Sequence, residues 1–166
     1  IEIKNKIKKK FYVNFFPKKF LVKNYSIYKK NYLKILDSIF YDLKLKVKNQ
    51  KVFLALSAGD DSRLVACLLK KYNFKVICFS YGLSNNWESR FAKKIANKLG
   101  FKHYNILVES KKVRKFFLSK EFKKYFDNYN NHDSVPSIHE IYVLKLLKRL
   151  NKQKVPIIMN GQPADG

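Results

Sequence analysis

The segment that most constrains the fold is residues 52–63, where an apolar run stops at small and acidic residues. Residues 52–56 are all apolar, and apolar positions with helical spacing begin at Leu64. This order predicts a buried strand, a tight loop and a helix. Small residues in such a loop leave backbone N–H groups open, and a helix N-terminus adds partial positive charge. We therefore expect the loop to bind a phosphate group.

The loop differs from the common nucleotide-binding loop that ends in Gly-Lys-Ser/Thr, because no lysine lies between Leu56 and Leu69. A simpler interpretation is an ordinary strand-to-helix turn capped by Asp61 or Ser62. The rest of the sequence is needed to distinguish a phosphate-binding loop from an ordinary capped turn.

The chain alternates between expected strands and helices. An amphipathic helix with apolar residues from Leu33 to Val47 comes first. We then expect strands at residues 52–56, 75–79, 104–108 and 155–159, and helices at residues 62–72, 88–99, 111–126 and 138–150. The spacing predicts an α/β fold, an open and mostly parallel sheet with helices on both faces. Ligands of such sheets bind beyond the C-terminal strand ends, where both the loop and residues 160–166 follow strands.

The chain has 166 residues, about one domain by the usual size of domains. Residues 1–22 contain two strand-like stretches, at 1–3 and 11–16, ended by Pro17. The sequence begins at Ile1 and ends inside an apparent motif, so we expect a fragment of a longer protein. No uncharged apolar run of about 18 residues is present, and neither a membrane span nor a secretory signal is expected.

The net charge of +24 raises the question of a nucleic-acid partner. However, 32 of the 36 basic residues are lysines, and they are spread over every segment. Abundant Lys, Asn, Ile, Phe and Tyr together are typical of AT-rich codons. Arginine, the preferred reader of phosphate and guanine, is scarce. We interpret the charge as a lysine-rich solvated surface and expect no nucleic-acid partner.

The cysteines and histidines form no recognisable site. Cys67 and Cys78 lie in apolar stretches and are expected to be buried small residues in a reducing, cytoplasmic compartment. No Cys/His spacing predicts a zinc site. His103, His132 and His139 share no motif, so structural roles are expected for them.

The loop Ser57-Ala-Gly-Asp-Asp-Ser62 resembles the S-G-G-x-D-S pyrophosphate loop of the N-type ATP pyrophosphatases, the PP-loop superfamily. Three further motifs resemble the synthetase domain of asparagine synthetases, in the same order. They are Phe79-Ser-Tyr-Gly82 followed by Gly100-Phe-Lys-His103, then Asp133-Ser-Val-Pro136, and finally Asn160-Gly-Gln-Pro-Ala-Asp165. The resemblance covers roughly residues 30–166. Arg63 and the form of the last motif look most like the asparagine-synthase-like proteins of surface-polysaccharide gene clusters.

The resemblance implies an adenine nucleotide alpha hydrolase-like, Rossmann-like fold and a set of site residues. Asp61 and Asp165 would be the catalytic residues and would carry Mg²⁺. Residues that would bind ATP and its pyrophosphate are Leu56, Ser57, Ala58, Gly59, Asp60, Asp61, Ser62, Ser80, Tyr81, Asn160 and Gly161.

The implied reaction is attack of a substrate carboxylate on ATP, which gives an acyl-adenylate and pyrophosphate, followed by displacement of AMP by ammonia. In the family, ammonia comes from glutamine in an N-terminal domain with a terminal cysteine, which this chain lacks. Residues 1–22 would then be trailing strands of that domain, 23–50 a linker and helix, and 51–166 a truncated PP-loop domain. We expect the isolated fragment to be inactive. The acceptor stays open between aspartate, a sugar carboxylate and a peptide carboxylate.

Four positions depart from the family pattern. Ala58 replaces a glycine, which would cost on the order of 1–2 kcal/mol if the backbone there is left-handed. Gln162, Pro163 and Gly166 replace an acidic residue, a glycine and a glutamate. These departures leave open a degenerate, non-catalytic domain of the same fold, and the positive charge leaves open a second alternative, another PP-loop enzyme acting on tRNA.

Overall fold

The computed structural model describes residues 24–84, 86–128, 137–150 and 157–161. The chain divides into two compact units, residues 1–36 and 37–166. Helix α1 (Tyr25–Val47) begins in the first unit and ends in the second. The strand-like stretches expected at residues 1–3 and 11–16 lie outside the described residues.

Four parallel strands form the sheet of the second unit, β1 (Lys51–Ala55), β2 (Lys75–Gly82), β3 (Lys102–Leu107) and β4 (Ile157–Met159). Their order is β3-β2-β1-β4, and every neighbouring pair is parallel. The expected open parallel sheet is therefore confirmed. The chain runs outward from β1 to β3 and then returns to the opposite side of β1, so the strand order reverses between β1 and β4. Such a switch point is where open α/β sheets bind ligands.

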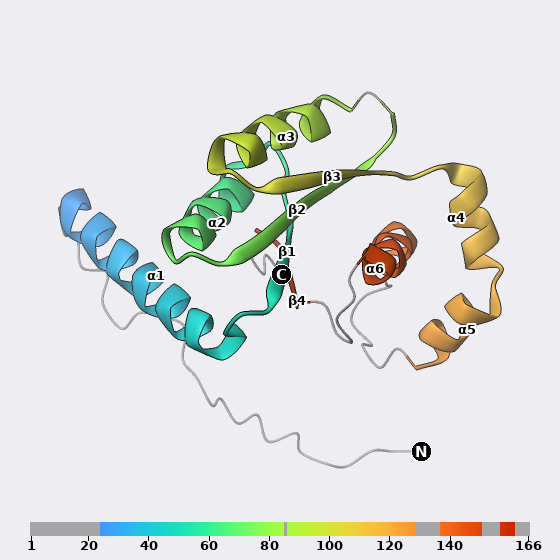
Figure 1. The fold of residues 1–166 in the computed structure, drawn as a ribbon, viewed down its shortest axis with the longest axis horizontal. Helices are drawn as coiled ribbons and strands as arrows, with labels where there is room; N and C mark the ends of the chain where they lie inside the picture. Colours follow the sequence, from blue (N-terminus) through green and yellow to red (C-terminus); the bar gives the residue numbers. More distant parts are fainter. Residues whose placement is uncertain (1–23, 85, 129–136, 151–156, 162–166) are drawn as a thin grey trace, which may run out of the picture. The chain divides into compact units, whose positions relative to one another are not determined.

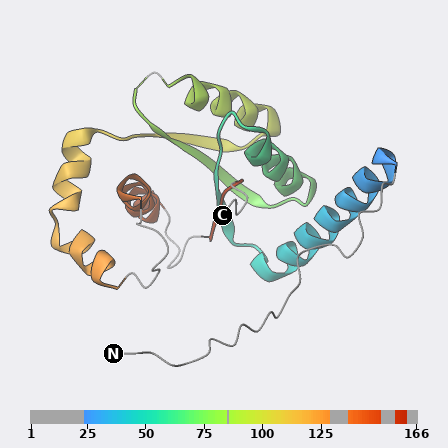
Figure 2. The same ribbon diagram turned by 180° about the vertical axis from the view of Figure 1, so that it is seen from behind.

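The helices of this unit cover both faces of the sheet (Figures 1 and 2). Helices α2 (Asp60–Lys71) and α3 (Trp87–Leu99) lie on one face, and α6 (Ile138–Leu150) lies on the other. Helix α3 has ordinary end signals: the side chain of Asn86 accepts a hydrogen bond from the Glu88 amide at 2.9 Å, and Gly100 ends the helix in the left-handed region at φ 74°.

Alternation along the strands separates two apolar layers. Phe53 and Phe79 point to the α6 side, where they pack in one core cluster with residues of α4, α5 and α6. Its members from these helices are Val113, Phe116, Phe122, Ile141, Tyr142, Val143 and Leu147. On α2 and α3, the fully buried residues include the small side chains Ala66, Ala92 and Ala96.

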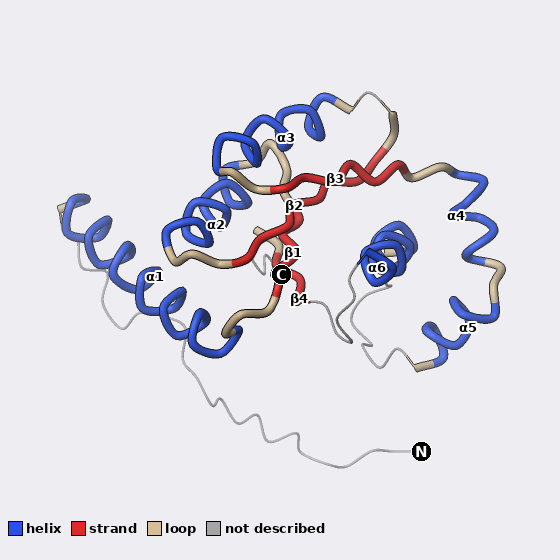
Figure 3. The backbone as a smooth tube through the Cα atoms, in the orientation of Figure 1, coloured by secondary structure: helices blue, strands red, loops and turns tan. Residues whose placement is uncertain are grey.

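The expectation of a single helix at residues 111–126 is wrong. The structure has two helices there, α4 (Ser110–Phe117) and α5 (Lys120–Asp127), seen as separate coils in Figure 3. Ser119 makes the break, because its hydroxyl donates to the Phe116 carbonyl at 2.5 Å and accepts from the Phe122 amide at 3.2 Å. The aromatic rings of Phe116 and Phe122 meet edge to face across it, 5.7 Å apart.

The expectation for the two cysteines is confirmed for one of them. Cys78 is fully buried in β2, and burial raises the pKa of its thiol to about 12. Cys67 is exposed, so its expected burial is wrong: it lies between buried Ala66 and Leu68 but on the outer side of α2. Within the described ranges, no helix is long and apolar enough to cross a membrane.

Candidate functional site

The expected phosphate loop connects β1 to α2. The Leu56 amide donates to the Phe79 carbonyl at 2.8 Å, which extends the pairing with β2 one residue beyond β1. The chain then turns through residues 57–59 and enters α2 at Asp60. This short connection places the helix N-terminus at the C-terminal end of the central strand.

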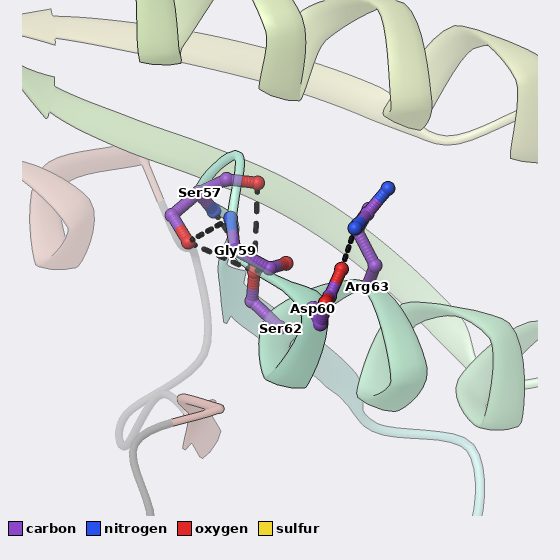
Figure 4. A network of polar contacts seen from close by, with 5 residues as sticks. All are labelled: Ser57, Gly59, Asp60, Ser62 and Arg63. Carbon is purple, nitrogen blue, oxygen red and sulfur yellow. Dashed lines mark hydrogen bonds and ion pairs between the residues drawn. The ribbon is translucent and has the colours of Figure 1, made fainter.

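Two serine side chains brace the loop from inside (Figure 4). The hydroxyls of Ser57 and Ser62 are 3.0 Å apart, and the Ser57 amide donates to Ser62 Oγ at 3.2 Å. The Gly59 amide donates to Ser57 Oγ at 3.1 Å, and Ser62 Oγ donates to the Gly59 carbonyl at 3.2 Å. Ser62 is buried, and Ser57 is exposed. The loop is therefore held in one shape by its own polar groups before any ligand arrives.

The start of α2 leaves backbone donors open. Gly59 precedes the helix with φ −70°, and no side chain caps it. The amides of Asp60 and Asp61 have no hydrogen-bond partner within the described chain, as expected for an uncapped first turn. Ala58 does not have a positive φ, so alanine at this position carries no left-handed strain. The helix N-terminus thus offers unpaired N–H groups and partial positive charge.

The final motif reaches the same place from β4. A Cβ atom at Gly161 would lie 2.6 Å from Ser62 Cα and 2.7 Å from the carbonyl carbon of Asp61, so only glycine fits there. A cavity of about 280 Å³ opens beside this contact. We call it the loop cavity; its lining residues are Ala55, Ser57, Gly59, Asp61, Ser62, Asn160 and Gly161.

A second cavity, of about 300 Å³, lies between the ends of β1 and β2 and the start of α3. We call it the β2–α3 cavity; its lining residues are Ala55, Leu56, Ser57, Phe79, Ser80, Tyr81, Asn86, Glu88 and Ser89. It shares Ala55 and Ser57 with the loop cavity. The two cavities together bring nine of the predicted site residues to one edge of the sheet.

A third cavity of about 340 Å³ lies on the opposite face, against α6. We call it the α6 cavity; its lining residues are Ala55, Phe79, Tyr81, Glu140, Val143, Leu144, Ile158 and Asn160. Tyr81 lines both this cavity and the β2–α3 cavity. Its hydroxyl donates to Glu140 Oε1 at 3.3 Å. Burial, with a further contribution from the Glu140 carboxylate, raises the pKa of Tyr81.

Some expected site residues lie elsewhere. Asp60 is 87% exposed and pairs with Arg63 one turn along the helix, pointing away from both serines (Figure 4). Ala58 is half-buried and lines none of the three cavities. Asp165 lies outside the described residues, as do the departures at Gln162, Pro163 and Gly166.

Sequence reasoning missed several polar residues around these cavities. Asn86 had a recognisable signal, since asparagine directly before a helical pattern is a preferred N-cap. Ser89 and Glu140 had none, and His103 ended one of the family-like motifs but was expected to have only a structural role. Ser80 Oγ and His103 Nε2 are 2.9 Å apart, yet the two residues are 23 positions apart in the sequence. Such contacts come from strand pairing and cannot be read from local pattern.

Comparison with known proteins decides the family. The sequence profile described as asparagine synthase matches residues 44–166, which is most of the chain. The chain belongs to the asparagine synthase family. This confirms the resemblance drawn from the four motifs, including the assignment to the PP-loop superfamily.

Relatives of this asparagine synthase family member include enzymes of other names. The tRNA-specific 2-thiouridylases MnmA of Ehrlichia ruminantium (strain Gardel) and Ehrlichia canis (strain Jake) are each 29% identical, over 72% of this chain and 36% and 35% of their own lengths. The chain thus spans about a third of these curated relatives. The NH3-dependent NAD synthetase of Campylobacter jejuni, solved with a nitrate ion, matches with a TM-score of 0.52 at 18% identity, over 80% of this chain and 56% of that one. That likeness confirms the α/β fold.

Proposed function

We propose that this chain is the ATP-binding part of an asparagine-synthase-like carbon–nitrogen ligase that adenylates a carboxylate for attack by ammonia. The observation that carries the proposal is the meeting of the braced loop and Gly161 at one cavity, at the switch point of the sheet. Membership of the asparagine synthase family supports it.

The two cavities at this edge suit the parts of a nucleotide. The unpartnered amides of Asp60 and Asp61 and the α2 N-terminus favour the phosphates. The adjoining β2–α3 cavity combines apolar walls from Leu56 and Phe79 with a few polar groups, as small-molecule pockets do. Ser57 lines both cavities, so a nucleobase in the β2–α3 cavity and a polyphosphate on the loop would belong to one bound nucleotide.

The oxygen atoms available as metal ligands in the loop cavity fit Mg²⁺. This ion takes oxygen ligands and is usually held by one or two carboxylates together with substrate phosphates. Asp61 lines the loop cavity, and within the described residues no cluster of three or more His, Cys, Asp or Glu occurs that would favour another metal. Asp61 and Asp165 would hold Mg²⁺, which when bound neutralises charge on the phosphates.

The proposed reaction has two steps. A carboxylate oxygen of the acceptor attacks the α-phosphorus of ATP, and pyrophosphate leaves as the acyl-adenylate forms. Ammonia then attacks the acyl carbon, and AMP leaves as the amide forms. The α6 cavity offers a place for the acceptor, because it adjoins the loop cavity through Ala55 and Asn160. The loop amides would hold the phosphates through the first step.

The complete reaction is proposed for the full-length protein, since this chain covers about a third of its curated relatives. There, ammonia would come from glutamine hydrolysed in a separate domain. For the isolated chain we propose ATP binding without amide formation.

The test is pyrophosphate release by the full-length protein from ATP and Mg²⁺, with a panel of carboxylates that includes aspartate and uronic acids. Asp61→Asn removes the carboxylate in the loop cavity, and Asp127→Asn, at the exposed end of α5, is the matched control. We expect carboxylate-dependent release that is lost only with Asp61→Asn. No release and no ATP binding would reject the enzyme and leave a degenerate domain.

A second candidate is an enzyme acting on tRNA, which the likeness to the tRNA-specific 2-thiouridylases favours. Sulfur transfer needs a reactive thiolate, but Cys78 is fully buried with a pKa raised to about 12. Cys67 is exposed on α2 and lines none of the three cavities. Tight, salt-sensitive tRNA binding together with carboxylate-independent ATP cleavage would favour this candidate over the first.

A further inference from the structure

Helices α4 and α5 meet at a corner that carries exposed apolar side chains. Leu118, between the two helices, is 73% exposed, and Phe117 and Phe126 are 46% and 54% exposed. Together with Lys120 and Lys123 they line a hollow of about 440 Å³, and we call these five residues the α4–α5 patch. Both helices lie at an outer edge of the unit that contains the sheet (Figures 1 and 2). Exposed apolar side chains that gather in this way mark an interaction surface.

The patch is presented by a fixed corner of the fold. The buried ring of Phe122 lies 5.0 Å from that of Phe117 and 6.3 Å from that of Phe126, measured between ring centroids. Ser119 holds the turn through its hydrogen bonds to the end of α4 and the start of α5. The apolar side chains are therefore exposed although the backbone that carries them is held in place.

Basic residues are concentrated around the patch. Seven of the 14 residues 111–124 are basic, against 36 of 166 in the whole chain. These seven are Lys111, Lys112, Arg114, Lys115, Lys120, Lys123 and Lys124. The one acidic residue of the segment, Glu121, is paired with Lys145 of α6. The general abundance of lysine in this protein does not account for the local excess.

The two lysines of the patch are not explained by the fold. Among the described residues, neither Lys120 nor Lys123 forms an ion pair. Both lie in the first turn of α5, where the helix dipole disfavours positive charge. Their charge, beside exposed apolar side chains, is left for an external group.

Helix α1 provides a comparison, because it also exposes apolar side chains, among them Leu45 at 59%. Only five of its 23 residues are basic, close to the proportion in the whole chain. The combination of exposed apolar side chains with excess positive charge is therefore a property of the α4–α5 patch and not of α1.

We propose that the α4–α5 patch binds the surface of a membrane that contains anionic lipids. Phe117, Leu118 and Phe126 enter the interfacial layer, and the lysines around them face the headgroups. Apolar side chains flanked by lysines are typical of segments that lie on a bilayer. Such a contact differs from a membrane span, which no described helix is able to form.

The chemistry of the patch favours a lipid surface over a protein or a nucleic acid. Six of the seven basic residues are lysines, which act as point charges and suit a diffuse anionic surface. Selective binding of carboxylate or phosphate groups favours the planar, bidentate guanidinium of arginine. Leu118, the most exposed residue of the patch, has no ring on which a base would stack.

The test is cosedimentation of the full-length protein with two kinds of vesicle. One is pure phosphatidylcholine, and the other is an equal mixture of phosphatidylcholine and phosphatidylglycerol. We expect binding to the anionic vesicles to be about tenfold tighter and to weaken as salt is added. Leu118→Ser should weaken it about tenfold, because an apolar side chain is lost from the interface. Lys120→Gln should weaken it about fivefold.

Two matched controls show whether the patch itself is responsible. Leu45→Ser removes an exposed leucine from α1, and Lys94→Gln removes the same charge as Lys120→Gln from an exposed position on α3. Neither should change vesicle binding. All four positions are exposed, and thermal unfolding of each variant verifies that it is folded. The measurement needs no catalysis, so this inference and the proposed function fail separately.

Absence of binding to anionic vesicles would overturn the inference. So would losses in Leu45→Ser and Lys94→Gln equal to those in Leu118→Ser and Lys120→Gln, because binding would then follow overall composition and not the patch. Polyglutamate and tRNA are the competing probes. Without vesicle binding, affinity for either one that is lost in Leu118→Ser would assign the patch to a protein or RNA partner instead.

Discussion

The two faces of the sheet are built from side chains of very different size. On the α2 and α3 side, helices carry fully buried alanines, among them Ala66 and Ala96. On the α6 side, the core cluster is rich in aromatic rings, including Phe53 and Phe79 from the strands. Small side chains let helices and loops approach closely, whereas rings fill volume. We infer that the first face sets the geometry of the site and that the second supplies more of the stability.

The largest expected effect comes from opening the aromatic face. Phe53 is fully buried in the middle of β1, paired in register with Ile77 and Ile158. Phe53→Ala should lower the free energy of unfolding by about 3–5 kcal/mol, because a large cavity would remain in the core. Urea unfolding followed by circular dichroism measures this directly.

Leu118→Ala is the control for Phe53→Ala. Leu118 is also a large apolar residue near this face but is 73% exposed, so its truncation should change stability by less than about 0.5 kcal/mol. Similar losses in the two variants would contradict the picture of a core concentrated on the α6 side.

The second prediction concerns the close contact between Gly161 and the start of α2, on the side of the sheet covered by α2 and α3. Gly161→Ala would place a Cβ atom against the backbone of Ser62 and Asp61, and neither can move without distorting the first turn of α2. We expect a loss of about 1–3 kcal/mol in stability, typical of overpacking, and a weaker affinity for ATP. Thermal unfolding and calorimetry measure the two effects.

Gly59→Ala is the matched comparison within the same site. Gly59 has φ −70°, and the nearest atom to a new Cβ there is the movable Ser57 Oγ at 3.2 Å. Its stability should therefore change far less than that of Gly161→Ala. Equal destabilisation would show that the loop, and not the contact with Gly161, is the rigid part of the site.

A smaller effect is expected at the helix break on the aromatic side. Ser119→Ala removes the side-chain cap of α5 and should cost about 1 kcal/mol of stability. If residues 111–126 formed one helix, the same change would stabilise the protein, since alanine favours helix interiors over serine. The sign of the change in urea midpoint therefore distinguishes two capped helices from one continuous helix.

Ser119 also shows where prediction from sequence stops. The strands, the phosphate loop and the family motifs are local patterns. They predicted the fold correctly, and they placed the candidate site at the C-terminal edge of the sheet. The break at Ser119 has no glycine or proline, and the apolar spacing runs through it, so pattern alone favoured one helix. The exposure of Cys67 depends on which side of α2 meets the sheet. The Ser80–His103 and Tyr81–Glu140 contacts join residues 23 and 59 positions apart, which only the folded chain brings together.

The smallest expected effect is a pH dependence of folding stability that arises on one face of the sheet and not on the other. His103 lies on the α3 side, where burial and Lys93 lower its pKa from 6.5, and the aromatic cluster contains no histidine among its described members. As pH falls below about 6.5, the unfolded chain takes up a proton on His103 before the folded chain does. Folding stability should therefore decrease as the pH is lowered through that range and be largest above it.

Urea unfolding from pH 7.5 to 5 should show this slope, and His103→Gln should reduce it. His139→Gln, at an exposed histidine on the other face, should leave the slope unchanged. A slope that persists in His103→Gln and disappears in His139→Gln would place the titrating group on α6 and contradict a buried neutral imidazole beside Ser80.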